Sequence, residues 1–208
     1  MIAPPADWSN AIVTGYWQLE PPSNWQPPAA LEAFLANGEA PIYIGFGSMS
    51  SRDPAQTAEL IVTALKQTGT RAILQSGWGG FKATDLPDAV LSVESVPHSW
   101  LFNKVAAVVH HGGAGTTAAG LRAGVPSLVI PFFGDQGFWG ERVAQLGVGP
   151  SPIPRKALTA QSLAQAIQTM TVNSEMRTRA AELGARIRTE DGVGNAVRVI
   201  NQLEVSKA

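Results

Sequence analysis

Short apolar runs alternate along the chain with stretches of helical periodicity, and this alternation restricts the fold more than any other feature. Runs that are typical of buried strands cover residues 41–47, 70–75, 90–96, 105–110 and 126–131. Apolar residues recur at helical spacing over residues 54–69, 116–123, 158–171, 175–189 and 193–205. Strands that alternate with helices form a parallel sheet with helices on both faces. We therefore predict an α/β fold whose ligand site lies at the carboxyl ends of the strands.

The first 40 residues do not follow this alternation and are rich in proline. Proline fixes φ and lacks an N–H group, so we expect irregular chain there, with one short helix near residues 31–37. The same stretch contains large aromatic residues, namely Trp8, Tyr16, Trp17 and Trp25. Disordered linkers rarely carry such side chains, and we expect them to lie against the domain or a partner. The sequence thus predicts a linker or extension at residues 1–40 and one domain at residues 41–208.

The composition excludes several classes of protein. Hydrophobic residues make up 45% and charged residues 15% of the chain, which suits a packed core. The formal net charge of -1 provides no electrostatic attraction for nucleic acid. The absence of cysteine rules out disulfides and thiolate zinc sites, and His98, His110 and His111 are poorly spaced from carboxylates for a metal site. From the spacing of the histidines we expect no metal ion. No apolar run approaches the roughly 18–20 residues that span a bilayer, and we expect a cytoplasmic protein.

A glycine-rich turn at residues 110–117 (HHGGAGTT) follows a predicted strand and leads into a predicted helix. Glycine lets the backbone approach a ligand closely, and the free N–H groups of a first helical turn attract anions. A histidine at the strand end can donate a hydrogen bond to phosphate, and Thr116 and Thr117 can cap the helix or do the same. The turn has neither the GxGxxG nor the P-loop pattern. A diphosphate site is the functional interpretation, and a tight turn without a ligand is the structural alternative.

The run at residues 110–143, HHGGAGTTAAGLRAGVPSLVIPFFGDQGFWGERV, resembles the donor-binding signature of UDP-sugar-dependent glycosyltransferases with the GT-B fold. It is most similar to the sterol glucosyltransferases and to the bacterial antibiotic and macrolide glycosyltransferases. Residues 43–49 (YIGFGSM) and 96–102 (VPHSWLF) resemble the same family in order and spacing. The resemblance covers about residues 14–150 and implies a Rossmann-like parallel sheet that forms one half of a GT-B fold.

The resemblance implies a set of donor-binding residues: Ser48, Val96, His98, His111, Gly113, Ala114, Gly115, Thr116, Asp135 and Gln136, with Trp78 as a further candidate. Ser48, His111 and the turn would contact the diphosphate of the donor. The Val96 backbone would read the uracil edge, and His98 would lie near the nucleoside or the phosphates. Trp78 can equally lie beside the base or pack in the core or a lid.

Asp135 and Gln136 match the acid–amide pair that holds the transferred hexose in this family. A carboxylate accepts hydrogen bonds from sugar hydroxyls, and an amide both donates and accepts them. An exposed loop is the alternative interpretation of the pair. We expect packing roles for His110, Phe138 and Trp139, although the last two can also cover the sugar.

Two positions depart from the plant form of the signature. Ser95 stands where the plant enzymes have a tryptophan that stacks on uracil, and Ala119 stands where they have a glutamate that holds the ribose. The resemblance is therefore to the bacterial and fungal branches, where other groups make these contacts. UDP-glucose is the expected donor, and other UDP- or dTDP-hexoses stay open.

The family takes its general base from a histidine near the start of an amino-terminal acceptor domain. His98, His110 and His111 all fall within donor-side motifs, so the resemblance implies no catalytic residue in this chain and no cofactor. We expect the carboxy-terminal, donor-binding half of an inverting glycosyltransferase that moves a hexose from a nucleotide sugar to a hydroxyl of a lipophilic acceptor such as a sterol. Alone, it should bind the donor without turnover.

The expected partners are the nucleotide sugar and the acceptor domain of the parent enzyme, which can also contact a membrane peripherally. A non-catalytic nucleotide-sugar-binding module or regulatory subunit is the main alternative. An epimerase or hydrolase fits less well because of the Asp135–Gln136 pair, and a dehydrogenase fits less well because no GxGxxG follows the first predicted strand.

Overall fold

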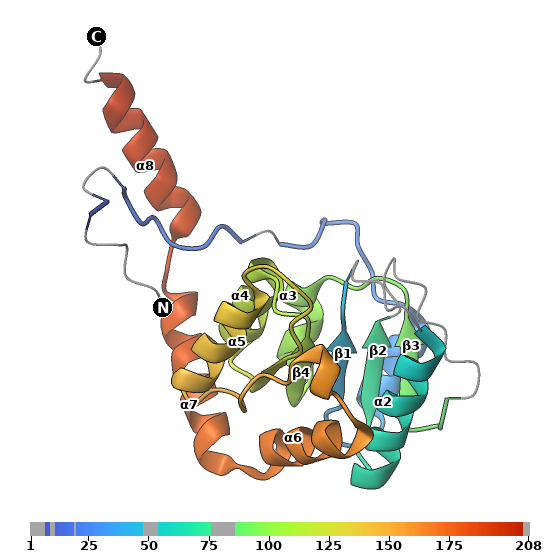
Figure 1. The fold of residues 1–208 in the computed structure, drawn as a ribbon. Coiled ribbons are helices and arrows are strands. Elements are labelled where there is room, and N and C mark those ends of the chain that lie inside the picture. The colour runs from blue at the N-terminus through green and yellow to red at the C-terminus, as the bar shows by residue number, and fades with distance from the viewer. Residues whose placement is uncertain (1–6, 9–10, 19, 48–53, 76–85, 206–208) are drawn as a thin grey trace.

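The computed structural model describes residues 7–8, 11–18, 20–47, 54–75 and 86–205. At its centre is a parallel sheet, and its strands are β1 (Ile42–Gly45), β2 (Ala72–Gln75), β3 (Val90–Val93), β4 (Ala107–His110) and β5 (Ser127–Val129). The five strands have the order β3-β2-β1-β4-β5, so the sheet grows in both directions from β1 and β4 (Figure 1). This arrangement confirms the α/β fold predicted from the alternation of strands and helices.

Each strand lies within the apolar run that predicted it but is shorter than the run. β1 and β4 are buried along their whole length, as expected for central strands of a covered parallel sheet. Successive side chains alternate between the two faces: Ile42 and Ile44 pack on one side of β1, and Tyr43 packs on the other. The run at residues 90–96 leaves the strand after Val93, so Val96 lies in the connection to the next helix.

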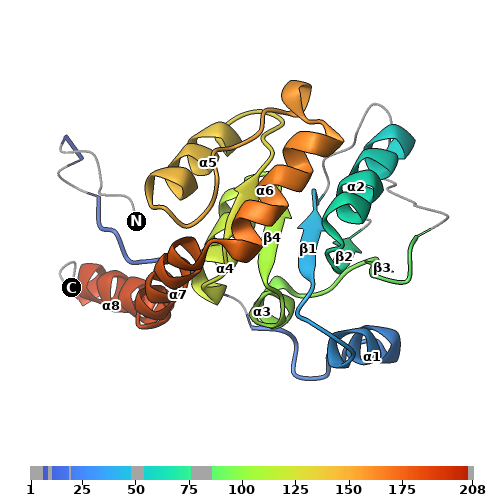
Figure 2. The ribbon, with the colours of Figure 1, turned by 90° about the horizontal axis from the view of Figure 1, so that it is seen from below.

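The helices are α1 (Ala29–Ala36), α2 (Pro54–Thr68), α3 (His98–Leu101), α4 (Ala114–Ala123), α5 (Gln136–Gln145), α6 (Ala160–Val172), α7 (Ser174–Arg188) and α8 (Gly192–Val205), with 3-10 turns at Phe102–Lys104 and Arg155–Ala157. Helices α2 and α6 pack together on one face of the sheet, and α1 and α3 lie on the other face (Figure 2). All helices expected from periodicity are present, and α4 already begins at Ala114. Two helices have no counterpart among the predicted ranges: α5, and the short α3, whose four residues show no period.

The starts of the helices differ in a way that bears on the site. Helix α6 has a capping box, in which Ser162 N donates to Thr159 Oγ1 and Thr159 N donates to Ser162 Oγ, each at 3.0 Å. Helix α7 is capped by Asn173, whose Oδ1 accepts from Met176 N at 2.9 Å. Helix α4 has Gly113 as its N-cap residue, which provides no side-chain cap. Its first N–H groups are therefore left for another partner.

The second part of the proline-rich extension packs into the domain. Leu31 of α1 is 1% exposed and belongs to the same core cluster as Tyr43. The Trp25 ring packs edge-on against Trp100, with 5.1 Å between the ring centroids. In contrast, Trp8 and Trp17 are 61% and 63% exposed. Trp25 thus lies against the domain, whereas the expectation that the aromatic residues lie against the domain or a partner stays a prediction for Trp8 and Trp17.

Helix α8 extends away from the layers of the domain, and the chain at residues 11–18 lies alongside its start (Figure 1). Several apolar side chains of α8 are exposed, among them Val197 and Ile200 at 50% and 54%. Of the helices in the described part of the chain, none combines the length and the apolar character needed to cross a membrane.

Candidate functional site

The order of the sheet reverses between β1 and β4, since β2 and β3 continue from one side and β5 continues from the other. In parallel α/β sheets, ligands bind outside the carboxyl ends of the strands at such a switch point. The loops after these two strands meet there, because a Cβ added at Gly47 would lie 3.4 Å from Cε1 of His111. The structure thus brings the predicted phosphate histidine to the switch point.

The turn between β4 and α4 requires glycine at two positions. Gly112 has φ of +93°, and a Cβ added there would lie 2.6 Å from Cγ1 of Val129 and 2.9 Å from the carbonyl oxygen of Gln136. A Cβ added at Gly113 would lie 2.5 Å from Nε2 of His111. The two glycines therefore let the chain reverse tightly and let the His111 ring lie against the backbone of the turn.

The amino end of α4 is suited to an anion. The N–H groups of Ala114, Gly115 and Thr116 occupy the first helical turn, where they have no partner within the helix, and the helix dipole adds partial positive charge. Thr117 does not take part, because it is buried and its Oγ1 donates to the carbonyl oxygen of Gly113 at 3.0 Å. The proposed role of Thr117 as a cap or phosphate contact is therefore not supported by its hydrogen bond. A diphosphate fits this helix end.

His110 and His111 have different environments although they are adjacent. His110 is completely buried, and its Nδ1 accepts a hydrogen bond from Gly112 N at 3.0 Å. Burial, together with the charges of His111 and His98, lowers the pKa of His110 to about 3, so this imidazole is neutral. The contact to Gly112 fits the packing role expected from the sequence.

His111 is only partly buried and lies at the open side of the turn. Burial lowers its pKa, and the Asp135 carboxylate opposes this effect. Its Nδ1 is buried without a hydrogen-bond partner among the described residues. Buried polar atoms normally have a partner, so this nitrogen indicates a group that binds from outside. His111 is thus positioned to contact a ligand at the start of α4.

His98 begins α3 and is held by aromatic residues. Its ring stacks on Phe102 with 4.5 Å between the centroids, and its Nε2 lies 3.2 Å from the Tyr43 hydroxyl. That hydroxyl donates to Oε1 of Gln75 at 3.1 Å. Burial and the charge of His111 lower the pKa of His98 to about 4, and burial raises the pKa of Tyr43. Val96, just before α3, has a buried side chain, so only its backbone can reach a ligand.

Asp135 and Gln136 begin α5 and are not equivalent. Gln136 is 5% exposed, and its Oε1 accepts from the backbone N–H groups of Phe132 and Phe133 at 2.7 and 3.2 Å. Asp135 is exposed, and its Oδ2 accepts from Nε1 of Trp139 at 2.8 Å. The amide oxygen of Gln136 therefore shapes the loop, whereas the carboxylate of Asp135 faces outward in a fixed orientation. The role of Trp139 as the residue that orients Asp135 was missed, although the i,i+4 spacing was visible in the sequence.

A pocket of about 730 Å³ runs along α4 on the side of α3. Helix α3 and its N-cap contribute His98 and Pro97 to the wall, and α4 contributes Gly115, Ala119 and Arg122. The extension contributes Tyr16, Trp17, Gln18 and Glu20, which the sequence did not assign to a site. The pocket thus joins two predicted donor-binding residues, His98 and Gly115, to part of the extension. The predicted residues Ser48 and Trp78 lie outside the described residues.

The described residues contain no group of three or more histidine, aspartate or glutamate side chains that could hold a metal ion. The candidate site consists instead of a helix end, neutral imidazoles and the carboxylate of Asp135. These groups can hold a phosphorylated ligand and an attached polyol through hydrogen bonds and the helix dipole.

Comparison with known proteins identifies relatives for most of the chain. The family model described as "Erythromycin biosynthesis protein CIII-like, C-terminal domain" matches residues 79–192. A sterol 3-beta-glucosyltransferase of Arabidopsis thaliana is 47% identical over 200 residues, which are 95% of this chain and 31% of the relative. A sterol 3-beta-glucosyltransferase of Aspergillus fumigatus is 42% identical over 221 residues, covering 100% of this chain and 16% of the relative. The chain therefore spans a third or less of the length of these curated relatives.

Solved structures share the fold. The glycotransferase of kitacinnamycin superposes with a TM-score of 0.70 at 24% identity, over 88% of this chain and 47% of that chain. CalG4, the calicheamicin glycosyltransferase, superposes with a TM-score of 0.68 at 23% identity, over 86% of this chain and 43% of that chain. The predicted Rossmann-like half of a GT-B fold is thereby confirmed.

Proposed function

Since the chain belongs to the family of erythromycin biosynthesis protein CIII-like C-terminal domains, we propose that it is the donor-binding part of an inverting glycosyltransferase. The observation that carries this proposal is the uncapped start of α4 at the switch point, beside the unpartnered Nδ1 of His111. A nucleoside diphosphate supplies the negative charge and the acceptor oxygens that both features lack. The hexose then lies toward Asp135, whose carboxylate faces outward.

UDP-glucose is the proposed donor, and the hydroxyl of a sterol is the proposed acceptor. The support comes from relatives named sterol 3-beta-glucosyltransferase, which are 42% to 47% identical to this chain. The acceptor would be bound by another part of the enzyme, because the residues discussed above all serve the donor side. Phe133 and Phe138, close to Asp135 in the sequence, have exposed rings that offer apolar surface near the proposed sugar side.

The proposed chemistry divides between this chain and the rest of the enzyme. The acceptor oxygen attacks the anomeric carbon, the bond between that carbon and the diphosphate oxygen breaks, and the configuration inverts. The start of α4 and His111 stabilise the charge on the departing diphosphate, and one such contact typically contributes about 2.7–4 kcal/mol in the transition state. No metal ion is needed for this stabilisation.

The general base that accepts the acceptor proton is proposed to lie outside this chain. His110 is completely buried and bonded to Gly112, and His98 is enclosed by Tyr43 and Phe102. Their pKa values of about 3 and 4 make both poor bases near neutral pH. His111 faces the leaving diphosphate rather than the acceptor.

Titration calorimetry of the chain with UDP, UDP-glucose and dTDP-glucose tests the proposal. We expect UDP and UDP-glucose to bind, and the His111→Ala variant to bind both at least tenfold more weakly, because it loses a contact to a charged group. Asp135→Ala should weaken UDP-glucose but not UDP. Asp88→Ala is the matched control, since Asp88 is exposed and lies just before β3, at the opposite edge of the sheet.

If no nucleotide binds, or if His111→Ala binds as well as the unaltered chain, the proposed donor site is wrong. Binding of UDP with no difference between UDP and UDP-glucose in any variant would instead favour a nucleotide-binding module without a sugar site.

A further inference from the structure

The extension that precedes the domain lines the pocket along α4, and one of its polar atoms has no partner there. Nε2 of Gln18 is buried without a hydrogen-bond partner among the described residues, and Gln18 is part of the pocket wall. An amide N–H group that is removed from water without a partner destabilises the free protein. A ligand oxygen in the pocket would satisfy it. The position of Gln18 therefore indicates a hydrogen-bond donor that is directed to a ligand.

A second residue of the extension reaches the start of α4. A Cβ added at Gly115 would lie 3.0 Å from the hydroxyl oxygen of Tyr16. Gly115 belongs to the first turn of α4, where a diphosphate is expected to bind. The Tyr16 hydroxyl is therefore close enough to the helix end to share a phosphate oxygen with its N–H groups. Tyr16 and Gln18 thus line the same pocket, and the Tyr16 hydroxyl lies at the start of α4.

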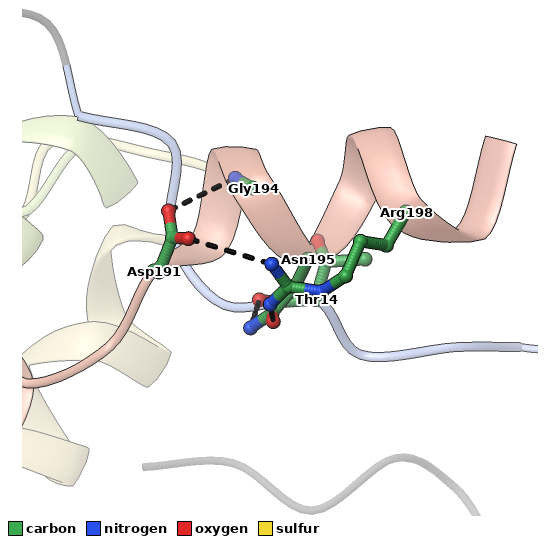
Figure 3. Close-up of polar contacts among 5 residues, drawn as sticks. All are labelled: Thr14, Asp191, Gly194, Asn195 and Arg198. Atoms are coloured by element: carbon green, nitrogen blue, oxygen red, sulfur yellow. Dashed lines mark hydrogen bonds and ion pairs between the residues drawn. The ribbon is translucent and has the colours of Figure 1, made fainter. Parts of the chain in front are cut away.

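Contacts at Thr14 and Glu20 hold the extension next to the pocket, and Figure 3 shows the contacts around Thr14. Nδ2 of Asn195 donates to the carbonyl oxygen of Thr14 at 2.9 Å. Asn195 is itself oriented, because its Oδ1 accepts from Arg198. Asp191 lies 3.8 Å from the same arginine and accepts from Gly194 N at 2.9 Å, which caps the start of α8.

Close packing and an ion pair complete this attachment. A Cβ added at Gly192 would collide with the carbonyl oxygen of Tyr16, so the extension lies directly on the start of α8. At the other end, the Glu20 carboxylate lies 3.7 Å from the guanidinium of Arg122 on α4. These contacts hold Thr14 at the start of α8 and Glu20 at α4, and the pocket residues Tyr16, Trp17 and Gln18 lie between them in the sequence.

We propose that residues 16–18 and 20–22 form one wall of the nucleotide site, where Tyr16 donates to the diphosphate and Gln18 donates to an oxygen of the nucleoside. This inference rests on the proposed function, because it takes a nucleoside diphosphate as the ligand. The nucleoside lies along α4 in the pocket that Ala119, Pro97 and His98 line. The oxygen that Gln18 binds is a pyrimidine carbonyl or a ribose hydroxyl, since an amide N–H group requires an acceptor.

Calorimetric titration of the chain with UDP and with inorganic diphosphate separates the two contacts. Gln18→Met keeps the size of the side chain and removes the donor, so UDP should bind about threefold to tenfold more weakly while diphosphate binds unchanged. Tyr16→Phe should weaken both ligands by a similar factor. Gln18→Glu, which replaces the donor with a charged acceptor, should weaken UDP further. Gln26→Met is the control, because Gln26 is an exposed glutamine of the same extension that is absent from the pocket wall.

The outcomes distinguish this inference from the proposed function. If the unaltered chain binds UDP and both Gln18 variants bind it equally well, the wall assignment is wrong while the donor site stands. Equal weakening of UDP and diphosphate by Gln18→Met would also overturn the assignment of Gln18 to the nucleoside. If the unaltered chain binds neither ligand, the proposed function fails, and this inference fails with it.

Discussion

Replacing Gly112 by alanine should destabilise the protein more than a comparable change at any exposed glycine. The φ of +93° places this residue in the left-handed region, where a Cβ costs about 1–2 kcal/mol. The new methyl group would also lie 2.6 Å from Cγ1 of Val129 and 2.9 Å from the carbonyl oxygen of Gln136, both in well-packed surroundings. Overpacking of this kind costs about 1–3 kcal/mol. The expected loss in the free energy of unfolding is therefore about 2–5 kcal/mol.

Two neighbouring glycines provide matched controls for the two contributions. Gly134 has φ of +65° but no atom within 4 Å of an added Cβ, so Gly134→Ala tests the backbone strain alone. Gly137 lies in α5, has no such φ, and has no atom within 4 Å of an added Cβ. Alanine there should be neutral or stabilising by up to about 1 kcal/mol, because it favours the helix.

Urea unfolding followed by circular dichroism measures all three variants. The account predicts a loss of about 1–2 kcal/mol for Gly134→Ala and a clearly larger loss for Gly112→Ala. In thermal melts, a chain of this size shifts by about 2–4 °C per kcal/mol, so Gly112→Ala should melt about 10 °C lower. If Gly112→Ala were no less stable than Gly134→Ala, the tight packing of the turn against β5 and α5 would be incorrect.

Three further predictions concern pH, the sugar and the extension. Because the folded-state pKa values of His98 and His110, about 4 and 3, lie below the unfolded value of about 6.5, the unfolded chain takes up protons first as the pH falls. The free energy of unfolding should therefore be full above pH 6.5 and decline toward pH 4. In urea titrations, each histidine should lower it by about 2 kcal/mol between pH 7.5 and pH 5. An unchanged free energy of unfolding at pH 5 would contradict the burial of these rings. Trp139→Phe should weaken UDP-glucose severalfold and leave UDP unaffected in calorimetry, because Asp135 loses the N–H group that orients it. Asn195→Ala should release Thr14 and weaken UDP severalfold, and an unchanged affinity would show that the extension needs no anchor at α8.

Local sequence patterns predicted the fold class but not helices α3 and α5. Apolar runs located each strand in the described part of the chain, since burial on both faces of the sheet requires nearly continuous apolar residues. The same patterns placed the turn at residues 110–117 after a central strand, and the rule for strand ends then directed attention to His111. The assignments of individual donor-binding residues stay predictions, because they depend on a ligand.

Contacts between distant parts of the chain could not be predicted. The hydrogen bond from Asn195 to Thr14 joins positions 181 residues apart, and no periodicity connects them. The inclusion of Tyr16 and Gln18 in the pocket wall depends on this contact and on the path of the extension across α4. Gln136 illustrates a different limit: its residue type suits a sugar, but the structure directs its Oε1 to the backbone of Phe132 and Phe133.

A crystal structure of the chain with UDP tests whether the start of α4 and His111 bind the diphosphate of a nucleotide sugar. We expect the diphosphate to lie within hydrogen-bond distance of His111 Nδ1 and of the N–H groups of Ala114, Gly115 and Thr116, with the nucleoside extending along α4. A diphosphate bound away from this helix end, with the His111 nitrogen still unpartnered, would contradict the account.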